Sequence, residues 1–344
     1  MKLRHLYLNL SWCCLITLGI LTSCSKQSKK QWIASAPAGN QYTQINREGV
    51  TVIPNGRLLT PLGKQITVAP HPFGLTLSPD GKTIITSNSG TGPFSISILT
   101  DFENTSPTVR QIPEGVNNDE GLLEAVFMGL AISPDNKKVY VAGGQQNKIF
   151  IFDTESGKKL GEISCNKTFD RTDYSDGYMG DLVMTQDGSR LYAVDQIGFR
   201  MLTIDTKTNS VISNTKTGRY PFGIALSPNE KTVYVANVGM FEYSYIKSLD
   251  KKRLTETSLP YPAFPYGSKE MKEGIKNDTL EVAGLGEMNA PESFSVWSFD
   301  VTKSQPEVIS KIKTGVLVGE QSKASQPWVV RVPTRLWPLI SLCL

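Results

Sequence analysis

Apolar and polar residues alternate along much of the chain, in short runs that predict β-strands. Residues 223–239 read GIALSPNEKTVYVANVG and hold two such alternations joined by Ser-Pro-Asn-Glu. Alternation is typical of a strand with one buried face, and proline followed by Asp, Asn or Gly residues is typical of a tight turn. The segment therefore predicts an antiparallel hairpin.

This hairpin pattern occurs four times. The copies align without a gap and begin 55, 52 and 42 residues apart, at 72–90, 127–145, 179–197 and 221–239. Each copy has an acidic residue or its amide at one turn position: Asp80, Asp135, Asp187 and Asn229. The chain is therefore an internal repeat.

Each hairpin is followed by two further strands. The segments 148–164, 199–218 and 294–315 each contain such a pair. In each, a strand ends in aspartate (Asp153, Asp205 or Asp300), and a polar turn and a second strand follow. The recurrence of these aspartates predicts structural Asx-turns rather than catalytic groups. Four antiparallel strands per 40 to 55 residues are typical of a β-propeller blade, whereas a β-sandwich would not repeat one pattern at this period. We predict an all-β propeller with about four to five blades, spanning 48–315.

The ends of the repeat region indicate an incomplete ring. Residues 48–74 match the second half of a blade, and a propeller that begins within a blade normally closes by supplying the missing half at its end. Residues 316–344 contain no such half. Permitted codons for 323–344, read in a shifted frame, give the repeat-like text GIPAVGGSSPNSVVATDKFVF. We expect 316–344 to be a frameshift product, and the intact protein to have seven blades.

The N-terminus has the features of an export signal. Lys2 and Arg4 precede a mainly apolar stretch at 6–21, which Leu-Thr-Ser-Cys24 follows. The last four residues resemble the lipobox of bacterial lipoproteins, in which the cysteine is acylated and the chain is cut before it. The resemblance implies a signal peptide at 1–23, lipid on Cys24, a polar tether at 24–47 and a membrane-anchored place in the bacterial cell envelope. A plain signal peptide or an uncleaved anchor remains the alternative.

Composition narrows the possible chemistry. A formal charge of +4 over 344 residues, with no basic stripe interleaved with aromatics, argues against nucleic acid as a partner. Five cysteines without a CxxC motif predict neither a disulfide framework nor a zinc knuckle. His71 is the single histidine after the predicted signal, so no multi-histidine metal site can form, and no glycine-rich nucleotide loop is present. We expect no catalytic constellation, metal or cofactor.

Candidate ligand-binding residues follow from position in the repeat. The first strand of a propeller blade lines the channel, and the loops before it and after the second strand gather on one face, where binding residues usually lie. For an unknown small molecule or protein, the candidates are His71, Asn88, Gln145, Asp195, Arg219, Tyr220 and Asn237. Asn88 and Asn237 are equivalent, which is also consistent with a structural role. The insertion at 240–291 either belongs to the binding face or covers a blade edge.

The repeat resembles the YVTN-type β-propeller repeat, most closely at YVAN, residues 234–237. The long interruption after Asn237 and its end, GLGEMNAPESFSVWSFDV, are similar to bacterial proteins in which such a propeller precedes a phosphoesterase domain of the alkaline phosphatase superfamily. We expect an exported, lipid-anchored binding or scaffold module without catalysis of its own. The alternative is the propeller part of a two-domain phosphoesterase whose catalytic domain is missing from this chain. A propeller lyase or quinoprotein would need more convergent histidine and acidic residues.

Overall fold

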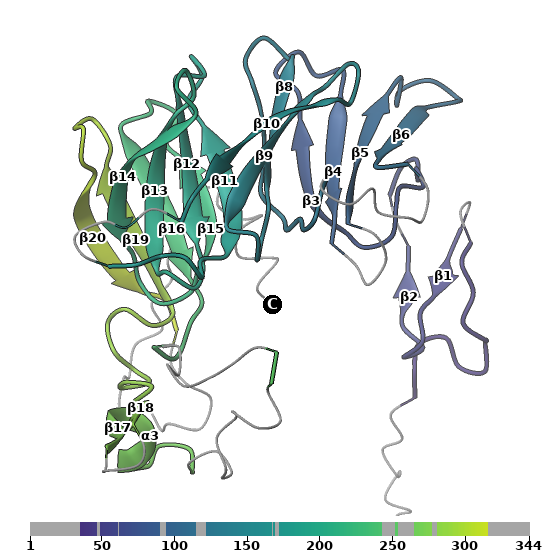
Figure 1. Ribbon diagram of the computed structural model, residues 1–344. Coiled ribbons are helices and arrows are strands. Elements are labelled where there is room, and N and C mark those ends of the chain that lie inside the picture. Colours follow the sequence, from purple (N-terminus) through teal and green to yellow (C-terminus); the bar gives the residue numbers. More distant parts are fainter. Residues whose placement is uncertain are drawn as a thin grey trace, which may run out of the picture. The chain divides into compact units, whose positions relative to one another are not determined.

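The computed structural model describes residues 35–46, 49–60, 62–89, 94–114, 122–166, 168, 172–242, 252–253, 265–276 and 281–315 (Figure 1). The predicted signal peptide, Cys24, the tether up to residue 34 and the tail at 316–344 lie outside these ranges. The chain divides into two compact units, Met1–Gln65 and Ile66–Leu344. Among the described residues, no helix is long and apolar enough to cross a membrane.

The first unit contains one short hairpin. β1 (Thr51–Val52) pairs antiparallel with β2 (Leu58–Leu59), and Gly56 turns the chain between them with a φ of 73°. The Ala38 backbone nitrogen donates to the Gly56 carbonyl at 2.9 Å, which joins the preceding segment to this turn. The sequence predicts half a blade in this region, and the structure has a two-stranded sheet there.

The second unit contains four antiparallel sheets of four strands each, which confirms the blade architecture that the sequence predicts. Blade 1 consists of β3 (Pro72–Leu77), β4 (Ile84–Asn88), β5 (Ser95–Thr100) and β6 (Thr108–Ile112). Blade 2 consists of β7 (Leu130–Ile132), β8 (Lys138–Ala142), β9 (Lys148–Asp153) and β10 (Lys159–Ser164). Blade 3 consists of β11 (Met179–Met184), β12 (Arg190–Asp195), β13 (Arg200–Asp205) and β14 (Ser210–Lys216). Blade 4 consists of β15 (Pro221–Leu226), β16 (Thr232–Asn237), β19 (Ser295–Asp300) and β20 (Glu307–Lys313).

The turn between the first two strands has the same construction in every blade. In blade 1 the Ser78 hydroxyl lies 2.6 Å from the Asp80 carboxylate, which also accepts the Lys82 backbone N–H. Ser133 with Asp135, Thr185 with Asp187 and Ser227 with Asn229 form the equivalent pairs. The next residue has a positive φ in all four copies: Gly81, Asn136, Gly188 and Glu230. The Ser-Pro-Asp-Gly pattern thus closes the hairpin through local hydrogen bonds, as its turn chemistry predicts.

A second turn repeats after the third strand. Asp153 accepts the backbone N–H of Ser156, Asp205 accepts those of Lys207 and Thr208, and Asp300 accepts that of Thr302. These three aspartates therefore form Asx-type turns, which confirms the structural interpretation of the repeated motif.

Apolar side chains fill the spaces between neighbouring blades. One cluster joins blades 1 and 2, a second joins blades 2 and 3, and a third joins blades 3 and 4. Glycine lets the inner strands approach each other: a Cβ added to Gly74 would lie 1.8 Å from the Met128 carbonyl oxygen. The Gly129 backbone nitrogen donates to the Gly180 carbonyl across the same kind of contact at 2.9 Å.

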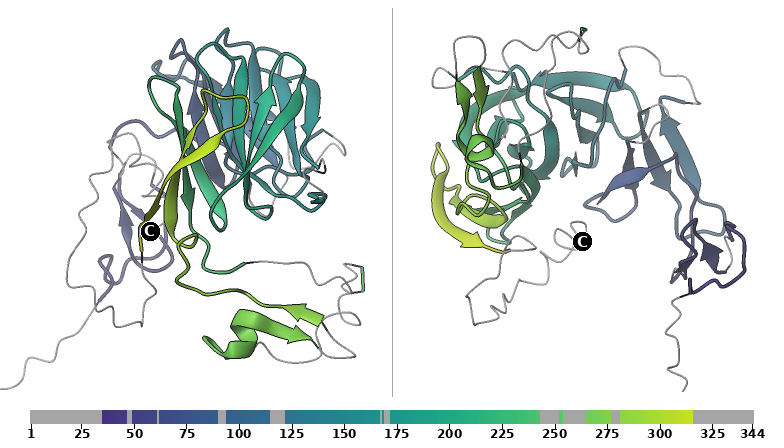
Figure 2. Two further views of the ribbon diagram at one scale, coloured as in Figure 1. Left: turned by 90° about the vertical axis from the view of Figure 1, so that its left-hand side faces the viewer. Right: turned by 90° about the horizontal axis from the view of Figure 1, so that it is seen from below.

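The four blades of the second unit form an open ring (Figure 2). Leu130 and Leu182 pack against the preceding blade and are 8% and 5% exposed, whereas their counterpart in blade 1, Leu75, is 68% exposed. Ile309 on the last strand of blade 4 is 59% exposed. Blades 1 and 4 therefore each present an apolar face that no described blade covers.

The insertion between β16 and β19 contains a small folded part of its own. Its described elements are α3 (Lys269–Glu273), β17 (Gly274–Lys276) and β18 (Glu281–Ala283), of which the two strands pair antiparallel. Buried Met271 and Met288 form its core, with Met240, Phe241, Leu285 and Phe294 packed against them. Ser268 caps the short helix by accepting the Met271 N–H. The insertion is thus more than a plain loop.

Candidate ligand-binding site

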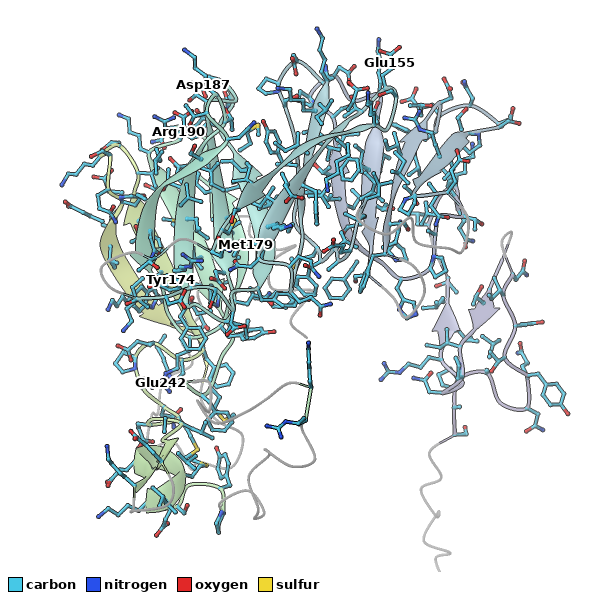
Figure 3. The ribbon with its side chains drawn as sticks, in the orientation of Figure 1. Glu155, Tyr174, Met179, Asp187, Arg190 and Glu242 are labelled. Carbon is cyan, nitrogen blue, oxygen red and sulfur yellow. The ribbon has the colours of Figure 1, made fainter. Side chains whose placement is uncertain are left out.

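The two ends of the sheets differ in what they present. Figure 3 shows Asp187, from a repeated hairpin turn, and Arg190, the first residue of β12, at one end, and Tyr174 towards the other, where the inner strands begin. At the hairpin-turn end, the polar side chains of each turn form hydrogen bonds within that turn, and this arrangement recurs from blade to blade. Because the hairpin-turn side chains already bond within their own turns, the end where the inner strands begin is the candidate site.

Aromatic side chains from all four blades meet at the start of the inner strands. The Phe127 ring centroid lies 5.2 Å from Phe73, 5.2 Å from Tyr178 and 6.0 Å from Phe222. We call these four residues the aromatic cluster. Phe73 is 42% exposed, and the other three are partly exposed. Tilted and edge-on ring pairs at these distances are favourable, so the cluster is held in place while part of its surface stays accessible.

Tyr220 and His71 occupy equivalent positions of blades 4 and 1, two residues before Phe222 and Phe73. Both residues directly precede the inner strand and have a positive φ, 50° and 55° respectively. Burial, with the nearby Tyr220 as a second cause, raises the pKa of Tyr178 above its ordinary value. His71 is exposed and Tyr220 half-buried. Of the residues that the sequence singled out, Tyr220 therefore lies near a ring of the cluster.

Asp195 belongs to a buried polar network in blade 3. Its Oδ2 lies 2.8 Å from Arg200 Nε, and its Oδ1 accepts the backbone N–H groups of Tyr178 and Gly198. Arg200 also donates to the Cys165 carbonyl at 2.6 Å and lies 3.8 Å from the Tyr174 ring centroid. The network holds the loop that carries Tyr178, so Asp195 supports the cluster rather than facing solvent.

Arg219 fastens the insertion to blade 4. Its Nη1 donates to the carbonyls of Met240 and Glu287 at 2.7 and 2.6 Å, and its Nη2 lies 2.7 Å from the Glu242 carboxylate. Its backbone nitrogen donates to Glu292. These contacts join the two ends of the insertion. The Arg219 side chain therefore has a structural role and is not available to bind a ligand.

The remaining candidates lie elsewhere at the same end of the sheets. Asn88 donates to Ser95 and Ser97, and Asn237 donates to Ser295, so each amide ties the second strand of its blade to the third. Both asparagines are buried. Gln145 is exposed in a turn of blade 2. The structure therefore brings Tyr220 close to a ring of the aromatic cluster and gives Asn88 and Asn237 contacts within their own blades.

Asp181 is a feature that position in the repeat did not reveal. It stands where the other three copies have Gly74, Gly129 and Gly223. Its carboxylate accepts the backbone N–H of Ile224 in blade 4 at 3.1 Å and that of Leu182 at 2.9 Å. Burial raises its pKa to about 6, although these hydrogen bonds act in the opposite direction. Asp181 thus links the inner strands of blades 3 and 4 through a side chain.

The described residues contain no group of three or more His, Cys, Asp and Glu side chains placed to hold a metal ion. No family model matches the chain, and no curated protein matches it.

Several solved structures are similar to part of the chain. Hydrazine synthase of Kuenenia stuttgartiensis is 16% identical with a TM-score of 0.42, covering 72% of this chain and 50% of that one. A protein from Lactobacillus plantarum is 15% identical with a TM-score of 0.45, covering 77% and 64%. The periplasmic gluconolactonase of Pseudomonas aeruginosa is 14% identical with a TM-score of 0.45, covering 77% and 63%. The chain thus spans about half to two thirds of these proteins, and likenesses of this size do not extend to activity.

Proposed function

We propose that this chain is an exported, lipid-anchored propeller module that binds a small ligand at the aromatic cluster and has no catalytic activity of its own. The observation that carries the proposal is the meeting of Phe73, Phe127, Tyr178 and Phe222 from four blades, with ring surface left accessible. A partly exposed cluster of large apolar rings on a rigid frame is a common form of binding surface.

The surroundings of the cluster support binding over catalysis. Arg200 and Arg219, the arginines placed near the start of the inner strands, are each paired with a carboxylate. Asp195 is committed to Arg200 and to three backbone N–H groups. General acid–base chemistry needs a titratable group within reach of a substrate, and the Asp195 carboxylate is already engaged by these structural partners, which leaves exposed His71 as the side chain to test.

A ligand screen of the full chain tests the binding proposal. We expect compounds from a mixed library of neutral, anionic and cationic metabolites to raise the melting temperature of the wild type. Phe127→Leu keeps an apolar side chain but removes the ring at the centre of the cluster, and should abolish these shifts. Tyr266→Ala removes an exposed ring in the insertion and serves as the control. The proposal would be overturned if no compound raised the melting temperature of the wild type. It would also be overturned if Phe127→Leu showed the same shifts in melting temperature as the wild type.

The lipid anchor has a separate test. Cells that express the chain are labelled with an alkyne fatty acid, and we expect label on the wild type and none on Cys24→Ala. Equal labelling of both proteins would remove the anchor from the proposal. The absence of catalysis is tested with a phosphate monoester and an aldonolactone as substrates: turnover of either by the purified chain, lost in His71→Ala, would show that this end of the propeller is an active site.

A further inference from the structure

Each described contact between neighbouring blades joins two different faces. We call the face that a blade turns to the preceding blade its front face, and the opposite one its rear face. On blade 2, Ile132, Val139 and Phe152 lie opposite one another on adjacent strands and pack against blade 1. Tyr140 and Ile151 alternate with them and pack against blade 3. A blade contact is therefore always a rear face against a front face.

The front face of blade 1 is apolar and has no described blade against it. One row of this face crosses all four strands in register: Leu77, Ile84, Leu99 and Val109. Leu77 is 53% exposed and Val109 38%, whereas Ile132, the counterpart of Leu77 in blade 2, is 7% exposed. The segment before β3 covers part of the face, where the Ala69 backbone nitrogen donates to Ser97 Oγ at 3.4 Å. The row next to the hairpin turn stays open at both of its ends.

The rear face of blade 4 is open in the same way. Tyr140 and Tyr192, on the rear faces of blades 2 and 3, are 3% and 4% exposed because the following blade covers them. Tyr234 has the same strand position in blade 4 and is only partly buried. Ile312 on β20 is 47% exposed, whereas Ile163 at this position of blade 2 is 1% exposed. The chain thus presents one uncovered rear face and one uncovered front face.

We propose that two copies of this chain associate, with the rear face of blade 4 in each copy packed on the front face of blade 1 in the other. The occupant is a second copy because a front face of this repeat is what every described rear face packs against. Contacts between unlike faces close into a ring when the rotation fits. Two copies of four blades give eight, within the usual range of about four to eight blades in a propeller. This pairing goes beyond the proposed function and does not depend on a ligand.

Native mass spectrometry and sedimentation velocity on the full chain test the pairing. We expect a dimer as the main species of the wild type. Leu77→Glu and Ile312→Glu each place a carboxylate in both contacts of the ring, and should raise the dissociation constant at least about a hundredfold because a buried unpaired charge is costly. Leu160→Glu is the matched control, since Leu160 is 50% exposed on blade 2, whose two faces are covered. This control should dimerise like the wild type, and circular dichroism checks that all three variants fold.

An equal mixture of Leu77→Glu and Ile312→Glu tests whether unlike faces meet. Each variant keeps the face that the other has lost, so one of the two contacts can form, and a heterodimer should appear although neither variant dimerises alone. A monomeric wild type, or a mass that grows beyond the dimer with concentration, would overturn the closed ring. A dimer that either variant retains would show that the copies meet through other surfaces. A mixture that stays monomeric would also contradict the pairing of unlike faces.

Discussion

Arg200 and Asp195 form an ion pair of 2.8 Å in the interior of blade 3, where their side chains are 1% and 0% exposed. The pair connects the end of β12 to the start of β13, and through the Cys165 carbonyl it also reaches the segment after β10. Breaking a buried pair by removing one partner leaves an uncompensated charge, which commonly costs about 3 to 5 kcal/mol.

The first prediction is that Arg200→Met strongly destabilises the protein, by about 3 to 5 kcal/mol, because Asp195 would be left buried without its partner. The same blade offers a control. Arg190 and Asp205 form an ion pair of 2.6 Å at the surface, with side chains 39% and 23% exposed, and Arg190→Met should change stability little. Urea unfolding of both variants measures the difference. Similar losses of stability in the two variants would show that burial does not determine how much the Arg200–Asp195 pair stabilises the protein.

Arg219→Ala should release the insertion while leaving the blades folded. The guanidinium holds the Met240 and Glu287 carbonyls and the Glu242 carboxylate, and no other described side chain makes these three contacts. Limited proteolysis should cut the variant between β16 and β19 at least several times faster than the wild type. Lys303→Met, which breaks the exposed pair with Glu307, is the control. Equal cleavage of Arg219→Ala and Lys303→Met would contradict the role of Arg219 as a fastening.

The sequence predicted the blades because their determinants are local and repeated. The Ser-Pro-Asp-Gly hairpin and the aspartate that ends the third strand act through hydrogen bonds to residues two to five positions away. Such contacts leave a readable pattern in each copy. The open ring could also be predicted from the sequence, because the copies of the repeat could be counted.

The aromatic cluster was less predictable because its contacts join residues far apart in the chain. Pro-Phe-Gly in the first and fourth copies placed Phe73 and Phe222 at one strand position, but the second blade supplies its ring from Phe127, one position earlier in the repeat. Position in the repeat also could not separate exposed His71 from buried Asn88. A departure from the repeat, Asp181 in place of glycine, was the signal that could have located the contact between blades 3 and 4.

Gly74→Ala should destabilise the protein, because the new Cβ would lie 1.8 Å from the Met128 carbonyl oxygen, a backbone atom that cannot turn away. Blades 1 and 2 would have to move apart at their inner strands, with an expected loss of about 1 to 3 kcal/mol. Gly161→Ala on β10 has open space at the new Cβ and should be neutral or stabilise by up to about 1 kcal/mol. Thermal unfolding compares the two, and an equal effect would show that the inner strands do not need glycine for their approach.

Asp181 should make stability depend on pH between about 4 and 6. Burial raises its pKa in the folded protein to about 6, whereas the ordinary value of 3.8 applies to the unfolded chain. In this window the folded protein holds a proton that the unfolded chain has lost, so the contribution is fully present below pH 4 and is lost as the pH rises through 6. It amounts to at most about 3 kcal/mol. Asp181→Asn cannot titrate and should remove this part of the pH dependence, which urea midpoints measured from pH 4 to pH 7 would reveal as the difference between the two proteins. The same slope in both would mean that the carboxylate stays charged between the blades, held by the N–H groups of Ile224 and Leu182.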